Sequence, residues 1–387
     1  MSLVAGSLVA RTLARPSFES AFAAPAFVRA MLAFESALAA AQAAEGLLPQ
    51  SSADAIAAAC ARISIDIEAL VAEGKRSATL AVPLVRVLRA AVPAAAHAHV
   101  HLGATSQDVL DTAMALCLRP CLDEADRSLE AAVRSLARRA REHRATPMLG
   151  RTLMQPAAPI TAGLKLARWA TALAADRERL AEARACGLAV QLGGPVGNLE
   201  SMGSKGAAIR HRLALALGLA DAPAWHAHRN AWVDLLDRIG QVVLSGGKIA
   251  RDLALLSQPE VGEMLEAPPR EGVGASSAMP HKRNPVGCVH GVAAALAMPG
   301  LLATVHAAGI AEHERALGGW QAELAAVPRI AAALGTCLDF LDTIAESLVV
   351  DAARMKTNVA AYGEPGAGAS VDAAADELLA GLAAYIS

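Results

Sequence analysis

The stretch Gly272-Val-Gly-Ala-Ser-Ser-Ala-Met-Pro-His-Lys-Arg-Asn-Pro285 combines glycines, two adjacent hydroxyl groups, a lysine and an asparagine. Its last two residues are typical of a helix start, because Asn caps helices and Pro fits the first helical position. A Gly-rich loop therefore leads into a helix N-terminus, whose unpaired N–H groups and dipole attract anions. We expect this loop to bring a hydroxyl and a cation to a carboxylate substrate and to close over it.

The apolar sequence on either side of this loop predicts an all-α protein. Of the 387 residues, 54% are hydrophobic but only 3% are aromatic, so Ala, Leu and Val dominate, which favours packed helices over sheets. No convincing alternating strand pattern is found. Helical periodicity predicts helices over residues 27–47, 51–73, 79–96, 105–144 with an interruption near Pro120, 156–186, 203–218, 230–257, 285–310, 322–348 and 371–385.

Several of these helices are longer than usual and need partners along their whole length. They predict a long central helical bundle that is shared between subunits. Residues 291–311 are the one segment that resembles a membrane span, but Pro299 and His306 favour a central bundle helix. The expected parts are an N-terminal helical domain (1–100), a central bundle (101–350) and a short C-terminal segment (351–387).

Charge and cysteine content exclude several classes of partner. The formal net charge of −2 offers no broad attraction for nucleic acid or an anionic membrane, so we expect neither as a partner. Cys117 and Cys121 lie one helical turn apart, but the other cysteines do not complete a zinc site with them. Scattered cysteines and a start without signal-peptide order predict reduced thiols in a cytoplasmic protein.

Three polar patches interrupt the apolar helices: residues 101–108, residues 150–156 and the loop quoted above. We expect each patch where a loop meets a helix start, and Thr105 with Asp108 is close to a capping box. The patches offer hydroxyl and amide donors, which suit a site that binds several carboxylates and stabilises a carbanion. We therefore expect chemistry without a metal or another cofactor, on a small polycarboxylate substrate.

Ser276 is the candidate base, because Lys282 and the helix-start N–H groups would lower the pKa of its hydroxyl. Each candidate also has a structural alternative: Thr105 caps a helix, and Arg315 pairs with Glu312 or Glu314 instead of a substrate carboxylate. The candidates for catalysis are Ser276, Lys282 and Asn284. The candidates for substrate binding are His101, Thr105, Ser106, Gln155, Ser277, Met279 and Arg315.

These patches resemble the fumarase/aspartase superfamily over nearly the whole chain, to about residue 358. The run from Ser276 to Pro285 is similar to its signature. The resemblance implies that Ser276 is the catalytic serine, supported by Lys282 and Asn284. It also implies that Thr105 and Ser106 bind a substrate carboxylate. The same resemblance implies a homotetramer in which each active site combines residues from three subunits.

Within this superfamily, residues 101–112 and 312–323 resemble the bacterial 3-carboxy-cis,cis-muconate cycloisomerases. That resemblance implies metal-free conversion of 3-carboxy-cis,cis-muconate to 4-carboxymuconolactone in protocatechuate degradation. Fumarate-releasing lyases have His after Gly-Arg-Thr, where this chain has Leu153. A cycloisomerase does not need that imidazole, because its leaving group is an internal carboxylate that departs without a proton.

Two alternatives remain open. One is a fumarate-releasing lyase of the adenylosuccinate lyase type. Such enzymes bind a nucleotide phosphate through Ser and Arg in a region where this chain has Trp320, Gln321 and Leu324, which cannot bind it. The other is a non-catalytic structural relative. Members of the superfamily normally have a third helical region after the bundle, and this chain has about thirty residues after Asn358, so that region is expected to be mostly missing.

Overall fold

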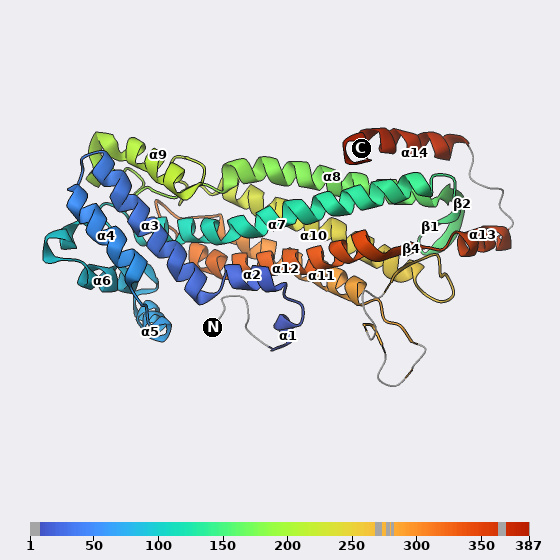
Figure 1. Cartoon of the computed structure of the whole chain (residues 1–387), viewed down its shortest axis with the longest axis horizontal. Coiled ribbons are helices and arrows are strands. Elements are labelled where there is room, and N and C mark those ends of the chain that lie inside the picture. Colours follow the sequence, from blue (N-terminus) through green and yellow to red (C-terminus); the bar gives the residue numbers. More distant parts are fainter. Residues whose placement is uncertain (1–7, 268–272, 276–278, 280–281, 363–368, 387) are drawn as a thin grey trace. The chain divides into compact units, whose positions relative to one another are not determined.

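The computed structural model describes residues 8–267, 273–275, 279, 282–362 and 369–386. Long helices dominate these residues, and two short antiparallel sheets of two strands each accompany them (Figure 1). The predicted all-α class is confirmed, whereas the expectation that strands are absent was wrong.

The α-helices are Leu8–Arg11 (α1), Pro16–Ala21 (α2), Ala24–Ala44 (α3), Gln50–Arg62 (α4), Ile67–Ser77 (α5), Ala81–Ala91 (α6), Ser106–Glu142 (α7), Ala162–Gly187 (α8), Gly206–Leu217 (α9), Asn230–Leu256 (α10), Val286–Ala308 (α11), Gly319–Ser347 (α12), Ala352–Ala361 (α13), Ala369–Gly381 (α14) and Ala383–Ile386 (α15). The 3₁₀-helices are Ala94–His99 (η1) and Glu200–Lys205 (η2). The strands are Pro147–Thr152 (β1), Gln155–Thr161 (β2), Met264–Glu266 (β3) and Leu348–Val350 (β4).

The chain divides into two compact units, each assembled from three segments. Unit 1 comprises Met1–Leu122, Glu182–Asp237 and Gly300–Ala332. Unit 2 comprises Asp123–Ala181, Arg238–Pro299 and Ala333–Ser387. The three-part division expected from the sequence stays a prediction.

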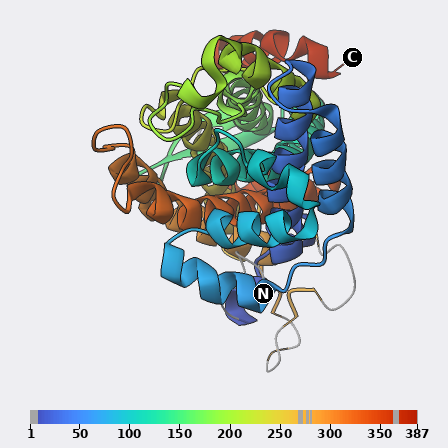
Figure 2. The ribbon, with the colours of Figure 1, turned by 90° about the vertical axis from the view of Figure 1, so that its left-hand side faces the viewer.

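Unit 1 holds the first polar patch beside a small helical core. In this unit α3 packs against α4 and α9, and α5 packs against α6 (Figures 1 and 2). The predicted helix over residues 51–73 is interrupted between Arg62 and Ile67. The interruption follows from Ile63 and Ile65, which disfavour helix, and from Asp66, whose carboxylate caps α5 by accepting from Ala69 N at 3.0 Å.

Unit 2 holds the second and third patches. Its β1–β2 hairpin replaces the first turn and a half of the helix predicted over residues 156–186, which begins only at Ala162. Pro156 and Pro159 lie in β2, where neither has to donate to a helix. The Thr161 hydroxyl then accepts from Leu164 N at 3.1 Å and caps α8.

The helix α7 continues through Pro120, so the predicted interruption there was wrong. Proline removes one intrahelical hydrogen bond and usually kinks or breaks a helix. Here the neighbouring Leu118, Cys121 and Leu122 are all buried, and their packing holds the helical conformation. Tertiary packing therefore outweighs the local preference of proline.

Among the described residues, three helices are long and apolar enough to cross a membrane, rather than the single one expected. The most apolar windows of α3 and α12 are 50% and 72% buried within the chain. The window of α11 is only 22% buried, so one chain leaves most of this apolar helix uncovered.

We predict that Gly246→Ala lowers the free energy of unfolding by about 1–3 kcal/mol through overpacking. An added Cβ at Gly246 would lie 2.2 Å from the Cys337 sulfur, and Cys337 is fully buried. Gly381→Ala is the matched control, because nothing lies within 4 Å of a Cβ there. Chemical denaturation measures both variants, and equal stabilities would contradict the close packing of α10 on α12.

Candidate functional site

The first patch is a turn that is fixed to α3 by two hydrogen bonds. His101 and Gly103 have positive φ angles of 61° and 71°, so the chain reverses before α7. The His101 ring nitrogen Nδ1 lies 2.6 Å from the Glu35 carboxylate, and Gln42 Nε2 donates to Leu102 O at 2.7 Å. These contacts position the start of α7 relative to α3.

His101 is a candidate for substrate binding, and its charge state depends on Glu35. Burial disfavours the imidazolium, but the adjacent Glu35 carboxylate outweighs burial and raises the pKa of His101 above its ordinary value. The ring is therefore more easily protonated than a free histidine. It forms an ion pair at its Nδ1 side whenever it is charged.

Asp108 joins the first patch to a glycine-rich segment that the sequence analysis did not single out. Its fully buried carboxylate accepts from Gly193 N, Gly194 N and Thr105 N, each at 3.0 Å, and from Gln191 Nε2 at 2.9 Å. Burial raises the pKa of Asp108 to about 6, and the four N–H donors oppose this rise.

Thr105 and Ser106 stand at the beginning of α7, as predicted. The Thr105 carbonyl accepts from Asp108 N at 3.0 Å, and the Asp108 carboxylate reaches back to Thr105 N, which is half of a capping box. Neither hydroxyl has a hydrogen-bond partner among the described residues. Both side chains are half-buried, so both hydroxyls remain available to a ligand.

Arg315 does not pair with Glu312 or Glu314 in the described part of the chain. Its guanidinium donates to Gln107 Oε1 at 2.5 Å, to Pro195 O at 2.9 Å and to Gly194 O at 3.2 Å. It therefore holds the glycine-rich segment against the first turn of α7. Contact with a substrate stays a prediction for this residue.

A pocket of about 270 Å³ opens beside this patch within unit 1. Leu110 and Met114 line it from α7, one and two turns beyond Ser106. The other lining residues are Phe27, Val71, Gly74, Lys75, Ala78, Thr79, Leu80, Trp320, Gln321 and Leu324. Lys75 is the one charged side chain among them, and the Gln321 amide oxygen is buried without a hydrogen-bond partner.

The second patch forms the tip of the β1–β2 hairpin instead of a helix start, so its expected position was wrong. Leu153 and Met154 form a two-residue turn with φ angles of 49° and 65°, as in a type I′ turn. Their side chains are 95% and 67% exposed. The candidate Gln155 is also exposed and pairs with Thr152 across the turn.

A buried carboxylate holds this hairpin close to its tip, where Arg151 lies opposite Pro156. Glu263 accepts two hydrogen bonds from Arg151, both at 2.8 Å, and one from Asn358 Nδ2 at 2.8 Å. The Glu263 side chain is fully buried, while Arg151 is half-buried. Arg151 is thus occupied by a structural ion pair, which fixes β1 in place.

The third patch is a loop whose ends are paired. Gly274 O accepts from Asn284 N at 2.8 Å, and Ala275 forms an antiparallel bridge with Arg283. Glycine is required at 274, because its φ is 72° and an added Cβ would lie 2.4 Å from Asn284 O. The candidates Ser276 and Ser277 lie outside the described residues.

The described members of this loop are accessible. Lys282 and Met279 are exposed, and Lys282 N donates to Met279 O at 3.0 Å. Asn284 is half-buried directly before α11. The structure thus presents the Lys282 ammonium and the Asn284 side chain at the closed end of the loop.

The expected anion site at the N-terminus of α11 is already occupied. Glu266 accepts from Gly287 N at 2.9 Å and from Cys288 N at 3.1 Å. The first intrahelical bond runs from Val289 N to Pro285 O, so Asn284 is not the capping residue that the sequence predicted. A carboxylate from β3, about twenty residues earlier, caps the helix and neutralises its dipole.

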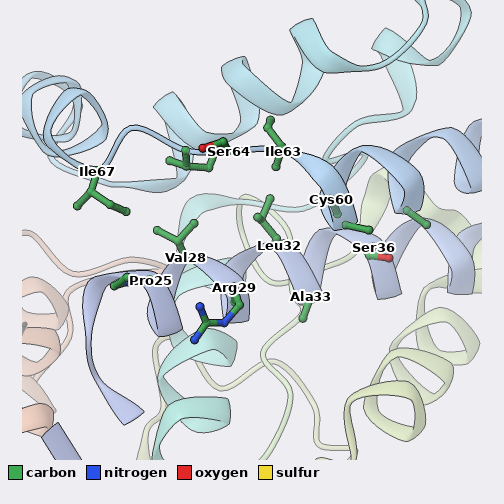
Figure 3. A pocket seen from close by; sticks show the side chains of 13 residues that line it. Pro25, Val28, Arg29, Leu32, Ala33, Ser36, Cys60, Ile63, Ser64 and Ile67 are labelled. Atoms are coloured by element: carbon green, nitrogen blue, oxygen red, sulfur yellow. The ribbon is translucent and has the colours of Figure 1, made fainter. Parts of the chain in front are cut away.

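Another groove of unit 1 contains none of the predicted site residues. It has a volume of about 640 Å³ and lies between α3 and the segment that joins α4 to α5. Figure 3 shows apolar side chains from both sides of this groove, including Val28, Leu32, Ile63 and Ile67. No group of three or more His, Cys, Asp or Glu side chains in the described part of the chain is placed to hold a metal ion.

Comparison with known proteins identifies the family. The sequence profile of the lyase family matches residues 11–300. This chain belongs to that lyase family. It is 43% identical over 316 residues to the 3-carboxy-cis,cis-muconate cycloisomerase of Bradyrhizobium diazoefficiens, which is 80% of this chain and 70% of the relative.

Two further relatives extend the likeness. The crystal structure of the 3-carboxy-cis,cis-muconate lactonizing enzyme from Pseudomonas putida matches with a TM-score of 0.84 and 40% identity, over 91% of this chain and 79% of that chain. The nitrosuccinate lyase of Streptomyces davaonensis is 38% identical over 92% of this chain and 78% of the relative. The predicted fumarase/aspartase type of helical fold is confirmed.

Sequence reasoning missed the carboxylates that support the three patches. The sequence predicted Asp108 only as a partner of Thr105 in a capping box, and it predicted no role for Glu263 or Glu266. One signal was present for Asp108, since Gly193-Gly194-Pro195 is a local cluster of turn-forming residues. No local signal identifies Glu266, because its partners belong to a helix that begins after the intervening loop.

We predict that the stability difference between the wild type and Asp108→Asn depends on pH. The folded pKa of Asp108, about 6, lies above its ordinary value of 3.8. Between these values the folded chain binds more protons than the unfolded chain, so rising pH lowers the free energy of unfolding. The Asn variant lacks this titration, and the difference should fall by up to about 3 kcal/mol between about pH 4 and pH 6.

Chemical denaturation at a series of pH values measures this difference. His101 titrates in both proteins, so its contribution largely cancels in the comparison. A difference that is constant over the whole range would contradict the raised pKa of Asp108.

Proposed function

We propose that this chain converts 3-carboxy-cis,cis-muconate to 4-carboxymuconolactone, as a cycloisomerase of aromatic-compound degradation in the cytoplasm. The observation that carries the proposal is the 43% identity to the Bradyrhizobium cycloisomerase over 80% of the chain. The matching fold of the Pseudomonas putida lactonizing enzyme supports it. The substrate is a small polycarboxylate, for which the patches offer hydroxyl, amide and ammonium groups.

The reaction forms one carbon–oxygen bond and one carbon–hydrogen bond. An internal carboxylate oxygen attacks one carbon of a double bond, and the π electron pair moves to the neighbouring carbon beside a second carboxylate. A proton then adds to that carbon, so the trianionic substrate and one proton give a dianionic lactone. The enolate-like intermediate carries additional negative charge, and its stabilisation requires preorganised donors.

We assign the proton transfer to Ser276 and the charge stabilisation to Lys282 and Asn284. Because Glu266 occupies the N-terminus of α11, that helix end does not supply a second positive charge. The free hydroxyls of Thr105 and Ser106 would donate to a substrate carboxylate. Chemistry of this kind needs no metal ion.

The pocket beside α7 favours a small carboxylate over a nucleotide. Its lining is apolar apart from Lys75 and a few neutral polar groups. Trp320 and Leu324 offer no charge to a phosphate group, and Lys75 alone suits a single carboxylate. The exposed Leu153 at the hairpin tip offers no acid or base, and the internal carboxylate requires none, because it attacks as an anion and leaves as an anion in the reverse direction.

We further propose a homotetramer with active sites that are shared between subunits. The apolar helix α11 leaves Leu296 68% and Val289 57% exposed, and burial of such surface drives association. The exposed hairpin tip at Leu153 and Met154 is a second apolar surface that a neighbouring subunit would cover.

We predict that Ser276→Ala lowers kcat about 10²–10⁴-fold, which is the usual effect of losing a general acid–base. Loss of ultraviolet absorbance of carboxymuconate measures the rate. Reaction in D₂O should place one carbon-bound deuterium in the lactone, which mass spectrometry detects. Wild-type activity in the alanine variant would contradict the assignment of the serine.

Three further measurements accompany this experiment. Arg138→Gln changes an exposed cation outside the patches, and its activity should equal that of the wild type. Sedimentation should show that Ser276→Ala keeps the assembly state of the wild type. Treatment with a chelator should leave the rate unchanged, and a loss of activity would contradict the metal-free mechanism.

We predict that Leu296→Asp dissociates the tetramer, because it places a charge on the apolar face of α11. Leu215→Asp in α9 is the matched control, since Leu215 is equally exposed at 69%. Size-exclusion chromatography with light scattering measures the mass of both variants. A tetramer in Leu296→Asp, or dissociation of both, would contradict assembly through α11.

A second candidate is a lyase that releases an unsaturated dicarboxylate. The nitrosuccinate lyase favours it, because its match spans 92% of this chain, more than the 80% of the Bradyrhizobium cycloisomerase. A panel of succinyl compounds separates the two functions. Release of fumarate at a rate above that of carboxymuconate lactonisation would favour the lyase.

A further inference from the structure

Unit 2 contains a cavity of about 460 Å³ that takes no part in the three patches. It lies between the first turns of α8 and the middle of α10, with one contribution from β2. Its lining residues are Ile160, Lys165, Arg168, Trp169, Ala172, Ser245, Lys248 and Ile249. Three of these eight residues are cations, and none is an acid.

Two of the cations share one carboxylate. Lys165 Nζ lies 3.3 Å from Asp252 Oδ2, and Lys248 Nζ contacts the same oxygen. Burial alone would raise the pKa of Asp252, but the two ammonium groups outweigh burial and lower that pKa, so Asp252 is ionised. The single negative charge of Asp252 therefore neutralises only one of the two ammonium charges.

The third cation is unpaired. Arg168 lies three residues after Lys165 on α8, and its guanidinium has no hydrogen-bond partner in the part of the chain that the structure describes. The other acid nearby is Asp176, which accepts a hydrogen bond from Ser245. Three cations against Asp252 and Asp176 leave the pocket positive even if both carboxylates are ionised.

The floor of the cavity is apolar. Trp169 and Ile249 are 3% and 1% exposed, and Lys165 Nζ lies 5.6 Å from the centre of the Trp169 ring. A ligand with a nonpolar body and more than one negative group matches this combination. Cations spread over two helices suit two separated carboxylates better than one compact phosphate, because each carboxylate can reach its own cation.

We propose that this cavity binds a small di- or tricarboxylate at a second site, in addition to the catalytic one. The two carboxylates pair with Arg168 and Lys248, while the carbon skeleton lies over Trp169. Because Ile160 belongs to β2, the ligand contacts the base of the hairpin whose tip is the second patch. Binding would therefore stabilise the hairpin against local opening.

Citrate, titrated against the full chain at constant ionic strength, is the probe, and tryptophan fluorescence with calorimetry is the measurement. We expect a saturable fluorescence response that acetate does not produce. The double variant Arg168→Gln/Lys248→Gln should lower the citrate affinity at least about tenfold, that is by about 1.4 kcal/mol. The exposed-cation control Arg138→Gln should bind like the wild type.

Two further variants locate the site. Trp169→Phe should lose the fluorescence response but retain calorimetric binding, and Lys282→Ala should keep both, because Lys282 belongs to the third patch. A response that is unchanged in the double variant, or that vanishes in Lys282→Ala, would overturn the proposal. Tighter binding of inorganic phosphate than of citrate would overturn the carboxylate class. None of these measurements depends on the cycloisomerase activity.

Discussion

A carboxylate that accepts several N–H groups supports each of the three polar patches, and two of these carboxylates, Asp108 and Glu263, are buried. Asp108 accepts from four donors at the start of α7, Glu263 holds Arg151 beside the tip of the hairpin, and the half-buried Glu266 caps α11. Removing a carboxylate from water costs several kcal/mol unless hydrogen bonds and charges replace the lost solvation. The donors are thus obligatory partners, and they fix the backbone on which the candidate side chains stand.

Sequence patterns predicted those parts of the fold and site that depend on neighbours along the chain. The start of α7 followed from Thr105 and Asp108, three residues apart. The hairpin could not be predicted from such local patterns, because Leu153 and Met154 are poor residues for a turn with positive φ. Only strand pairing and Glu263 determine this hairpin. The carboxylate that caps α11 was equally unpredictable, since only the folded chain brings β3 to that helix.

The role of Glu266 changes the electrostatics that the sequence implied. A free helix N-terminus provides about half a positive charge for a bound anion. Here that charge is compensated inside the chain, so a substrate that bears several carboxylates must depend on side chains. The exposed Lys282 beside the loop and Lys75 beside α7 are suited to this role, because neither has an ion-pair partner among the described residues.

The tip of the β1–β2 hairpin, which is the second patch, has a strained backbone. Two non-glycine residues with positive φ cost about 1–2 kcal/mol each, and the turn also exposes two large apolar side chains. A hairpin selected only for stability would have Asn-Gly at these positions. The Arg151–Glu263 pair secures the strands directly beside the turn, so the tip tolerates this strain with Leu153 and Met154 exposed. We therefore propose that the hairpin tip, like the apolar face of α11, is stabilised by contact with a neighbouring subunit.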